Sequence, residues 1–120
     1  MGILDSIKGM VLGLKDIEVN GNMHIDKLCK QFKEQFGTEL VVYKSLNTGR
    51  GAKRADMNVT LASVCPKRVE GITIKKSSTV GEVEDQFKES MGIGVQIMEP
   101  DGETFAPNNM MLKNVANIKK

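Results

Sequence analysis

Residues 25–44 read IDKLCKQFKEQFGTELVVYK and residues 80–99 read VGEVEDQFKESMGIGVQIME, so one pattern occurs twice, 55 positions apart. The apolar positions 25, 28, 32, 36, 40 and 42 of the first stretch correspond to 80, 83, 87, 91, 95 and 97 of the second. The identical pairs are Gln31/Gln86, Phe32/Phe87, Lys33/Lys88, Glu34/Glu89 and Gly37/Gly92. We interpret the chain as an internal duplication.

The spacing within each copy predicts a helix followed by a strand. Apolar residues at steps of three and four positions, such as Ile25, Leu28 and Phe32, share one face of a helix. Gly37 then stands where a glycine can end a helix in the left-handed conformation without Cβ strain. Thr79 followed by Glu82 predicts a capping box at the start of the second helix. The alternating apolar residues after each glycine are typical of a strand.

The correspondence extends on both sides of this stretch. Ile17 and Val19 match Ile72 and Ile74, which predicts a strand before each helix. After a deletion of four residues and a predicted turn at 100–102, residues 55–64 match 106–115. The predicted unit is strand, helix, strand, turn, strand and a short helical turn, with copy one at 15–65 and copy two at 70–120. Because no linker separates the copies, we expect strand 72–76 to be shared within one continuous domain.

A family resemblance is carried by ITIKKSSTVGEVEDQFKESMGI, then VQIMEPDGETFA, then MMLKNV. This order of strand, capped helix, hairpin and short turn resembles the ubiquitin-like β-grasp pattern. The resemblance implies an α+β fold: a tandem duplication of a β-grasp-like strand-helix-strand-strand unit, with a mixed sheet and two packed helices. Residues 117–120 read NIKK, whereas conjugated modifiers of that family are attached through a terminal Gly-Gly, which argues against a conjugated modifier.

Residues 1–14, MGILDSIKGMVLGL, lie outside the repeat and form a predicted amphipathic segment. Gly9 and Gly13 each cost about 1 kcal/mol of helix propensity, so a helix here is weak on its own. Three interpretations are open: packing on the core or on another subunit, attachment to a membrane surface, and N-myristoylation at Gly2. The apolar face would consist of Ile3, Leu4, Ile7, Met10, Val11 and Leu14.

Composition places the chain among folded domains of soluble type. Hydrophobic residues make up 40% and charged residues 27%, which does not indicate disorder. The sequence contains no apolar run of the roughly 18 residues that a membrane-spanning helix needs. The two cysteines, Cys29 and Cys65, have no counterparts in copy two and do not form a disulfide framework. We expect a reducing, cytoplasmic location, with peripheral membrane attachment as an open alternative.

Charge is distributed unevenly between the copies. Residues 44–76 hold eight basic and two acidic residues, whereas residues 77–103 hold seven acidic residues and one lysine. The loop SLNTGRGAKRA at 45–55 lacks the GxxxxGK[ST] pattern of a phosphate-binding loop, so it is not a nucleotide motif. The charges are either solvated faces or contacts to oppositely charged partners, and head-to-tail self-association would satisfy both regions. The candidate contacts to a partner or to phosphate are Arg50, Lys53, Arg54, Lys67 and Arg68.

Catalytic and metal-binding patterns are missing from the sequence. His24 is the only histidine, and its spacing to Cys29 and Cys65 fits no zinc site. The carboxylates at 82, 84, 85 and 89 are expected on a solvated helix face, with no apolar pocket to shift their pKa values. We therefore predict no enzyme, no cofactor and no catalytic residue. The predicted function is a protein interaction or adaptor module, and the alternative is a nucleic-acid-associated protein that uses the basic region 50–68.

Overall fold

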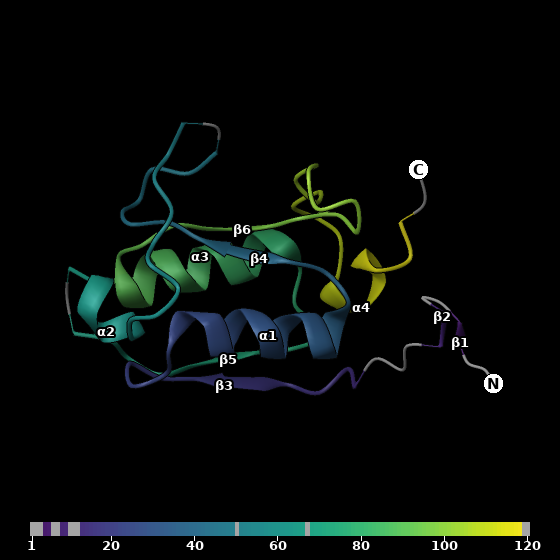
Figure 1. The fold of residues 1–120 in the computed structure, drawn as a ribbon, viewed down its shortest axis with the longest axis horizontal. Coiled ribbons are helices and arrows are strands. Elements are labelled where there is room, and N and C mark those ends of the chain that lie inside the picture. The colour runs from purple at the N-terminus through teal and green to yellow at the C-terminus, as the bar shows by residue number, and fades with distance from the viewer. Residues whose placement is uncertain (1–3, 6–7, 10–12, 50, 67, 119–120) are drawn as a thin grey trace.

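The computed structural model describes residues 4–5, 8–9, 13–49, 51–66 and 68–118, and Figure 1 shows their arrangement. The described part is a small α+β domain. Its two long helices are α1 (Ile25–Phe36) and α3 (Val80–Met91), and its two short helices are α2 (Leu61–Val64) and α4 (Leu112–Val115). The four strands of the domain body are β3 (Ile17–Val19), β4 (Leu40–Val42), β5 (Ile72–Ile74) and β6 (Val95–Ile97).

The two long helices form where the apolar stripe and the caps predict them. Each has 12 residues, and every member of the predicted stripe is fully buried, including Phe32 and Phe87. Gly37 and Gly92 end the helices with φ angles of 77° and 72°, in the left-handed region that glycine adopts without strain. At the start of α3, Thr79 and Glu82 form the predicted capping box. These local predictions are confirmed.

The strands pair in two antiparallel ribbons. In the β3–β5 ribbon Glu18 lies opposite Thr73, and in the β4–β6 ribbon Val41 lies opposite Gln96. Both central pairs join residues 55 positions apart. Segments 53–55 and 104–106 extend the second ribbon on its two outer edges, because Ala55 donates to the Val42 carbonyl at 2.9 Å and Ala106 donates to the Ile97 carbonyl at 2.8 Å.

The predicted mixed sheet is wrong. The ribbon pairings that the structure describes are all antiparallel, and β3 pairs with β5 rather than with the β4 strand of its own half. The reason is that each 12-residue helix, about 18 Å long, carries the chain from one ribbon to the other. The strands before and after a helix therefore belong to different ribbons.

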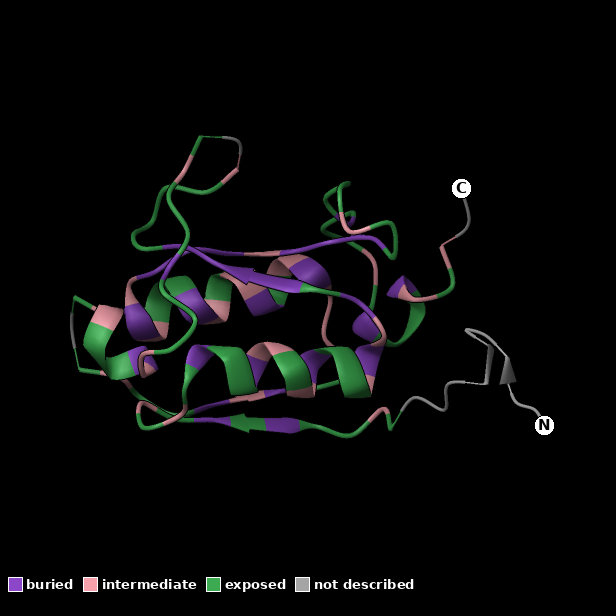
Figure 2. Cartoon of the chain, viewed as in Figure 1, coloured by how far each residue is buried: buried purple, intermediate pink, exposed green. Residues whose placement is uncertain are grey.

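The ribbons and the long helices enclose one hydrophobic core, as the buried positions in Figure 2 show. Both helices contact both ribbons: α1 packs on β3 and β4, and α3 packs on β5 and β6. The short helices α2 and α4 add Leu61 and Leu112, which are fully buried. Because the core draws on residues from 17 to 115, the two halves of the chain are stabilised together.

The N-terminal segment differs from the predicted helix. Leu4–Asp5 (β1) and Lys8–Gly9 (β2) form a short antiparallel pair, so at these described positions the helical interpretation is wrong. The weak helix propensity of Gly9 fits this outcome. Leu14 has a φ angle of 51°, packs half-buried against the core and donates its backbone N–H to the Gln35 carbonyl at 3.0 Å. The predicted face residues Ile3, Ile7, Met10 and Val11 lie outside the described residues.

Candidate interaction surface on the β4–β6 ribbon

The two ribbons differ on the faces that point away from the core. On the β3–β5 ribbon this face is polar, because Glu18 is exposed and accepts a hydrogen bond from the Thr73 hydroxyl at 3.0 Å. On the β4–β6 ribbon the central outward pair is Val41 and the half-buried Gln96, and Val41 forms a small buried apolar cluster with Tyr43 and Met98. A strand with apolar residues on both faces is covered on both faces. Here the loops after β4 and β6 provide part of that cover.

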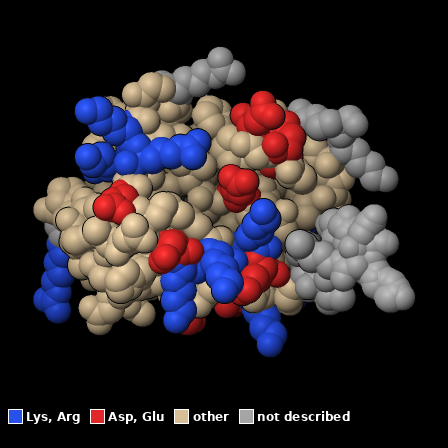
Figure 3. All heavy atoms as spheres, viewed as in Figure 1, with Lys and Arg blue, Asp and Glu red and all other residues tan. Residues whose placement is uncertain are grey.

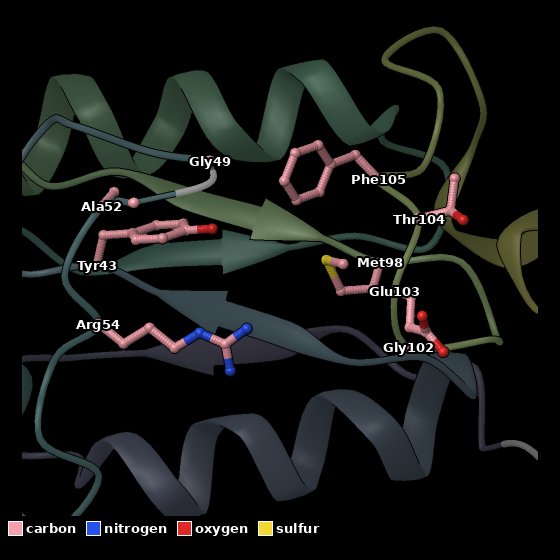
Figure 4. A pocket seen from close by; sticks show the side chains of 10 residues that line it. Tyr43, Gly49, Ala52, Arg54, Met98, Gly102, Glu103, Thr104 and Phe105 are labelled. Atoms are coloured by element: carbon pink, nitrogen blue, oxygen red, sulfur yellow. The ribbon is translucent and has the colours of Figure 1, made fainter.

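These loops leave a hollow of about 580 Å³ above the ribbon. Figure 4 shows Tyr43 and Met98 along the ribbon, with Arg54 and Phe105 on opposite sides and Glu103 towards one end. A volume of this size lies within the range of ligand-binding pockets, roughly 300 to 1,000 Å³. The lining residues are Tyr43, Gly49, Gly51, Ala52, Arg54, Met98, Gly102, Glu103, Thr104 and Phe105. We refer to these residues together with Val41 as the trough face.

Much of the trough face consists of matched positions from the two halves of the chain. Tyr43 and Met98 lie 55 positions apart, and Arg54 and Phe105 lie 51 apart, which is the offset after the four-residue deletion. The structure pairs them in the same way, since Tyr43 forms a β-bridge with Arg54 and Met98 forms one with Phe105. Although the backbone pattern matches, the side chains do not, so a guanidinium stands where the other half has an aromatic ring.

Two loop conformations around the hollow depend on glycine. Gly51 and Gly102 have φ angles of 84° and 74°, in the left-handed region that other L residues rarely adopt. A Cβ on Gly51 would meet nothing within 4 Å, so backbone conformation rather than lack of space accounts for that glycine. Gly102 completes the predicted turn after β6, where its N–H donates to the Glu99 carbonyl at 2.9 Å.

The trough face is electrostatically polarised. Exposed basic residues gather over the loop after β4, and acidic residues gather over the loop after β6, as Figure 3 shows. The carboxylate of Glu39 belongs to the acidic end, because its Oε2 lies 3.3 Å from the point that a Cβ on Gly102 would occupy. Of the charged residues, Arg54 and Glu103 line the hollow itself, and the others are exposed close to them in sequence or in space. We call Lys44, Lys53 and Arg54 the basic end, and Glu39, Asp101 and Glu103 the acidic end, and include both ends in the trough face.

The structure separates the predicted basic contacts. Lys53 and Arg54 are exposed at the basic end, and Arg54 lines the hollow. Arg68 is exposed in the connection between α2 and β5 and does not line the hollow. Arg50 and Lys67 lie outside the described residues.

Sequence reasoning missed the floor and side of the hollow at Tyr43, Met98 and Phe105. The available signal was the unbroken apolar run at 40–43, where a half-exposed strand would alternate.

A second hollow of about 460 Å³ lies between α1 and the β4 edge. Cys29 lines it and donates its thiol hydrogen to the Leu40 carbonyl at 3.2 Å. Burial raises the pKa of Cys29 to about 11, and the nearby charges of Asp26 and Glu39 add to the increase. The pKa of Cys65 is also raised by burial. Both cysteines are free, and a protonated thiol is a poor nucleophile, so the raised pKa lowers the reactivity of Cys29 at neutral pH.

The expectation of unshifted carboxylates on α3 is wrong for Glu84. This residue is 55 positions beyond Cys29 and is half-buried. Burial raises the pKa of Glu84 to about 7, a hydrogen bond with the Ile97 backbone opposes the increase, and the charge of Asp85 adds to it. The charge-rich sequence around residue 84 indicated a solvated face. The desolvation arises from packing beside β6, which is distant in sequence.

The described residues contain no group of three or more His, Cys, Asp or Glu side chains placed to hold a metal ion. His24 is exposed and precedes α1 without a side-chain capping hydrogen bond. It lines a hollow beside α1 with Asp26 and Glu34, away from the trough face. Of the helices in the described ranges, none has the length and apolar character needed to cross a bilayer.

Comparison with known proteins gives no family or relative for this chain. No model of a known family, no curated protein and no solved structure matches it.

Proposed function

We propose that this chain is a non-catalytic protein interaction or adaptor module that acts through the trough face. The observation that supports it most strongly is the contrast between the ribbons: one outer face is polar, and the other combines an apolar cluster with a charged, loop-rimmed hollow. Phe105 is 43% exposed at this hollow. Arginine is one of the residue types that dominate binding energy at protein interfaces, and phenylalanine is enriched at the cores of such interfaces.

The proposal includes the architecture from which the surface arises. We infer that the chain is a tandem duplication of a β-grasp-like unit. Support comes from the two 12-residue helices that begin 55 positions apart, from ribbon registers centred on pairs 55 apart, and from short helices 51 apart. In such a duplication the corresponding hairpin strands of both copies meet on one face, and divergence of their side chains makes that face asymmetric.

The test uses a photocrosslinking amino acid placed at residue 105 of the full chain in its host cell. We expect covalent adducts with protein at position 105, because this side chain is exposed over the trough face. The matched control carries the same amino acid at residue 18, which is exposed on the polar ribbon. An adduct pattern at 105 that is no stronger than the pattern at 18 would contradict the proposal.

A second candidate function is binding of single-stranded nucleic acid. The observation in its favour is that the exposed Phe105, a potential stacking side chain, lines the same hollow as the cationic Arg54. The acidic end of the trough face opposes a phosphate backbone that runs along its whole length. This candidate requires binding to a labelled oligonucleotide that weakens steeply with salt and is lost when Lys53 and Arg54 are replaced by alanine.

A cytoplasmic location and attachment to a membrane through residues 2–14 remain proposals. Flotation of the full chain with neutral and anionic liposomes, compared with residues 15–120, tests the attachment. Flotation of the full chain alone would support an interfacial segment. Equal behaviour of both proteins would count against it.

A further inference from the structure

The charge pattern of the trough face points to a specific partner. We propose that the trough face binds the trough face of a second copy of this chain, so that two copies form a closed dimer about a twofold axis. This inference rests on the proposed function, because it names the partner of the same surface. It is argued from three properties of that surface: the arrangement of its charges, the exposed Phe105 side chain and its size.

The charges make the trough face complementary to itself. At its basic end Arg54 lines the hollow and the preceding Lys53 is exposed; at its acidic end Glu103 lines the hollow and Glu39 lies beside Gly102. When two such faces meet, the twofold axis lies in the interface and perpendicular to the line that joins the two ends. This axis places the basic end of one copy over the acidic end of the other. The same operation creates this attraction twice. Opposite charges facing each other across an interface favour the encounter and fix its orientation.

The twofold arrangement also closes the assembly. An isologous contact uses the same patch on both copies, so no charged end is left for a third copy. A head-to-tail arrangement, which the sequence alone would also allow, leaves one basic and one acidic region unpaired at the tips of each assembly. The presence of both charge types on a single face therefore favours the dimer over an open chain.

The centre of the face offers one exposed apolar side chain for contact with a partner. Phe105 is 43% exposed, whereas Tyr43 and Met98 are buried and form the floor of the hollow beside it, as Figure 4 shows. Standard interfaces bury about 800 Å² per partner. The chain has a total accessible surface of 6868 Å², so one broad face of the domain can supply this area.

The test is sedimentation velocity of the full chain at roughly 10 to 200 µM, in buffers of about 50 and 500 mM salt. We expect a monomer–dimer equilibrium that weakens as salt increases. One variant reverses the basic end by Lys53→Glu and Arg54→Glu, and another reverses the acidic end by Glu39→Lys and Glu103→Lys. Each variant alone should dimerise at least about tenfold more weakly, because two pairs of like charges then face each other.

An equimolar mixture of the two variants gives the sharpest result. One variant is acidic at both ends and the other is basic at both ends, so we expect the mixture to form a heterodimer. The matched control, Lys75→Glu with Lys113→Glu, changes exposed charges away from the trough face and should leave dimerisation unchanged. Circular dichroism establishes that each variant is folded.

Three outcomes would overturn the inference: a wild-type chain that remains monomeric at the highest concentration, a dimer that both reversals leave unchanged, or a mixture that stays monomeric. Crosslinking from residue 105 distinguishes failure of the dimer proposal from failure of the proposed function. Adducts with other proteins and none with a second copy would refute the dimer while the interaction module stands. Absence of any adduct specific to residue 105 would count against both.

Discussion

Replacement of Glu84 by glutamine tests whether packing beside β6 desolvates this carboxyl group. In the folded chain the pKa of Glu84 is about 7, against an ordinary value of 4.5, and burial is the main cause. Below about pH 4.5 the folded and unfolded chains both hold the proton, so Glu84 causes no loss of stability. Between pH 4.5 and 7 only the folded chain keeps it, so the free energy of unfolding decreases as pH rises. Above pH 7 Glu84 is ionised in both the folded and the unfolded chain, so the loss of unfolding free energy stays constant.

The size of this effect follows from the interval between the two pKa values. At full strength an increase from 4.5 to about 7 corresponds to roughly 3 kcal/mol of folding free energy. Glu84 is only half-buried, so solvent screens its charge and the value must be reduced. We expect the wild-type chain to lose about 1 to 1.5 kcal/mol relative to Glu84→Gln between pH 5 and pH 8. Glutamine is similar in shape and carries no titrating group there.

The measurement is urea unfolding of both proteins at several pH values between 5 and 8. The difference in unfolding free energy between Glu84→Gln and wild type should grow with pH and then level off above pH 7. The matched control, Glu34→Gln, makes the same substitution at an exposed carboxylate on α1 and should change the free energy of unfolding only slightly. If the Glu84→Gln curve ran parallel to the wild-type curve, desolvation of this carboxyl group would be refuted.

The remaining predictions concern the helix caps and the thiols. Thr79→Ala should lower the free energy of unfolding by about 1 kcal/mol, because it removes the capping box. His24→Ala should lower it less, because His24 makes no side-chain capping hydrogen bond. Equal losses for the two variants in urea titrations would contradict this. Gly92→Ala should cost about 1 kcal/mol or more, because its φ angle is 72°; an unchanged urea midpoint would exclude the left-handed cap. At pH 8 a thiol reagent should react with folded Cys29 roughly a hundredfold more slowly than with the unfolded chain, because burial raises the folded pKa to about 11. Comparable rates would contradict the burial of this thiol.

The sequence predicts the helices well because their determinants are local. The apolar stripe from Ile25 to Phe36, the left-handed glycine at 37 and the capping box at Thr79 all act within a few residues of one another. The same applies to the turn completed by Gly102. Periodicity and caps are properties of a continuous segment, so they can be read without knowledge of the rest of the chain.

Strand pairing could not be predicted in the same way. A three-residue strand such as Ile17–Val19 shows which side chains face the core, but nothing in it specifies a partner. Its pairing with Ile72–Ile74 follows from the position of the helices between the ribbons. The trough face depends on the same long-range geometry, because it joins residues near 50 to residues near 105. The environment of Glu84 was missed for this reason as well.

The exposed position of Phe105 has an energetic consequence that separates folding from association. An aromatic side chain offers about 150 to 250 Å² to burial, and 43% of it remains accessible in the folded chain. At about 25 cal/mol per Å², covering the remainder would contribute about 2 kcal/mol, and folding of the single chain does not obtain this contribution. Single exposed apolar residues are common on protein surfaces. Phe105, however, lies beside Tyr43 and Met98 and faces Arg54 across one hollow. A twofold dimer would cover Phe105 in both copies, so the stabilisation that folding leaves unused would be gained twice on association.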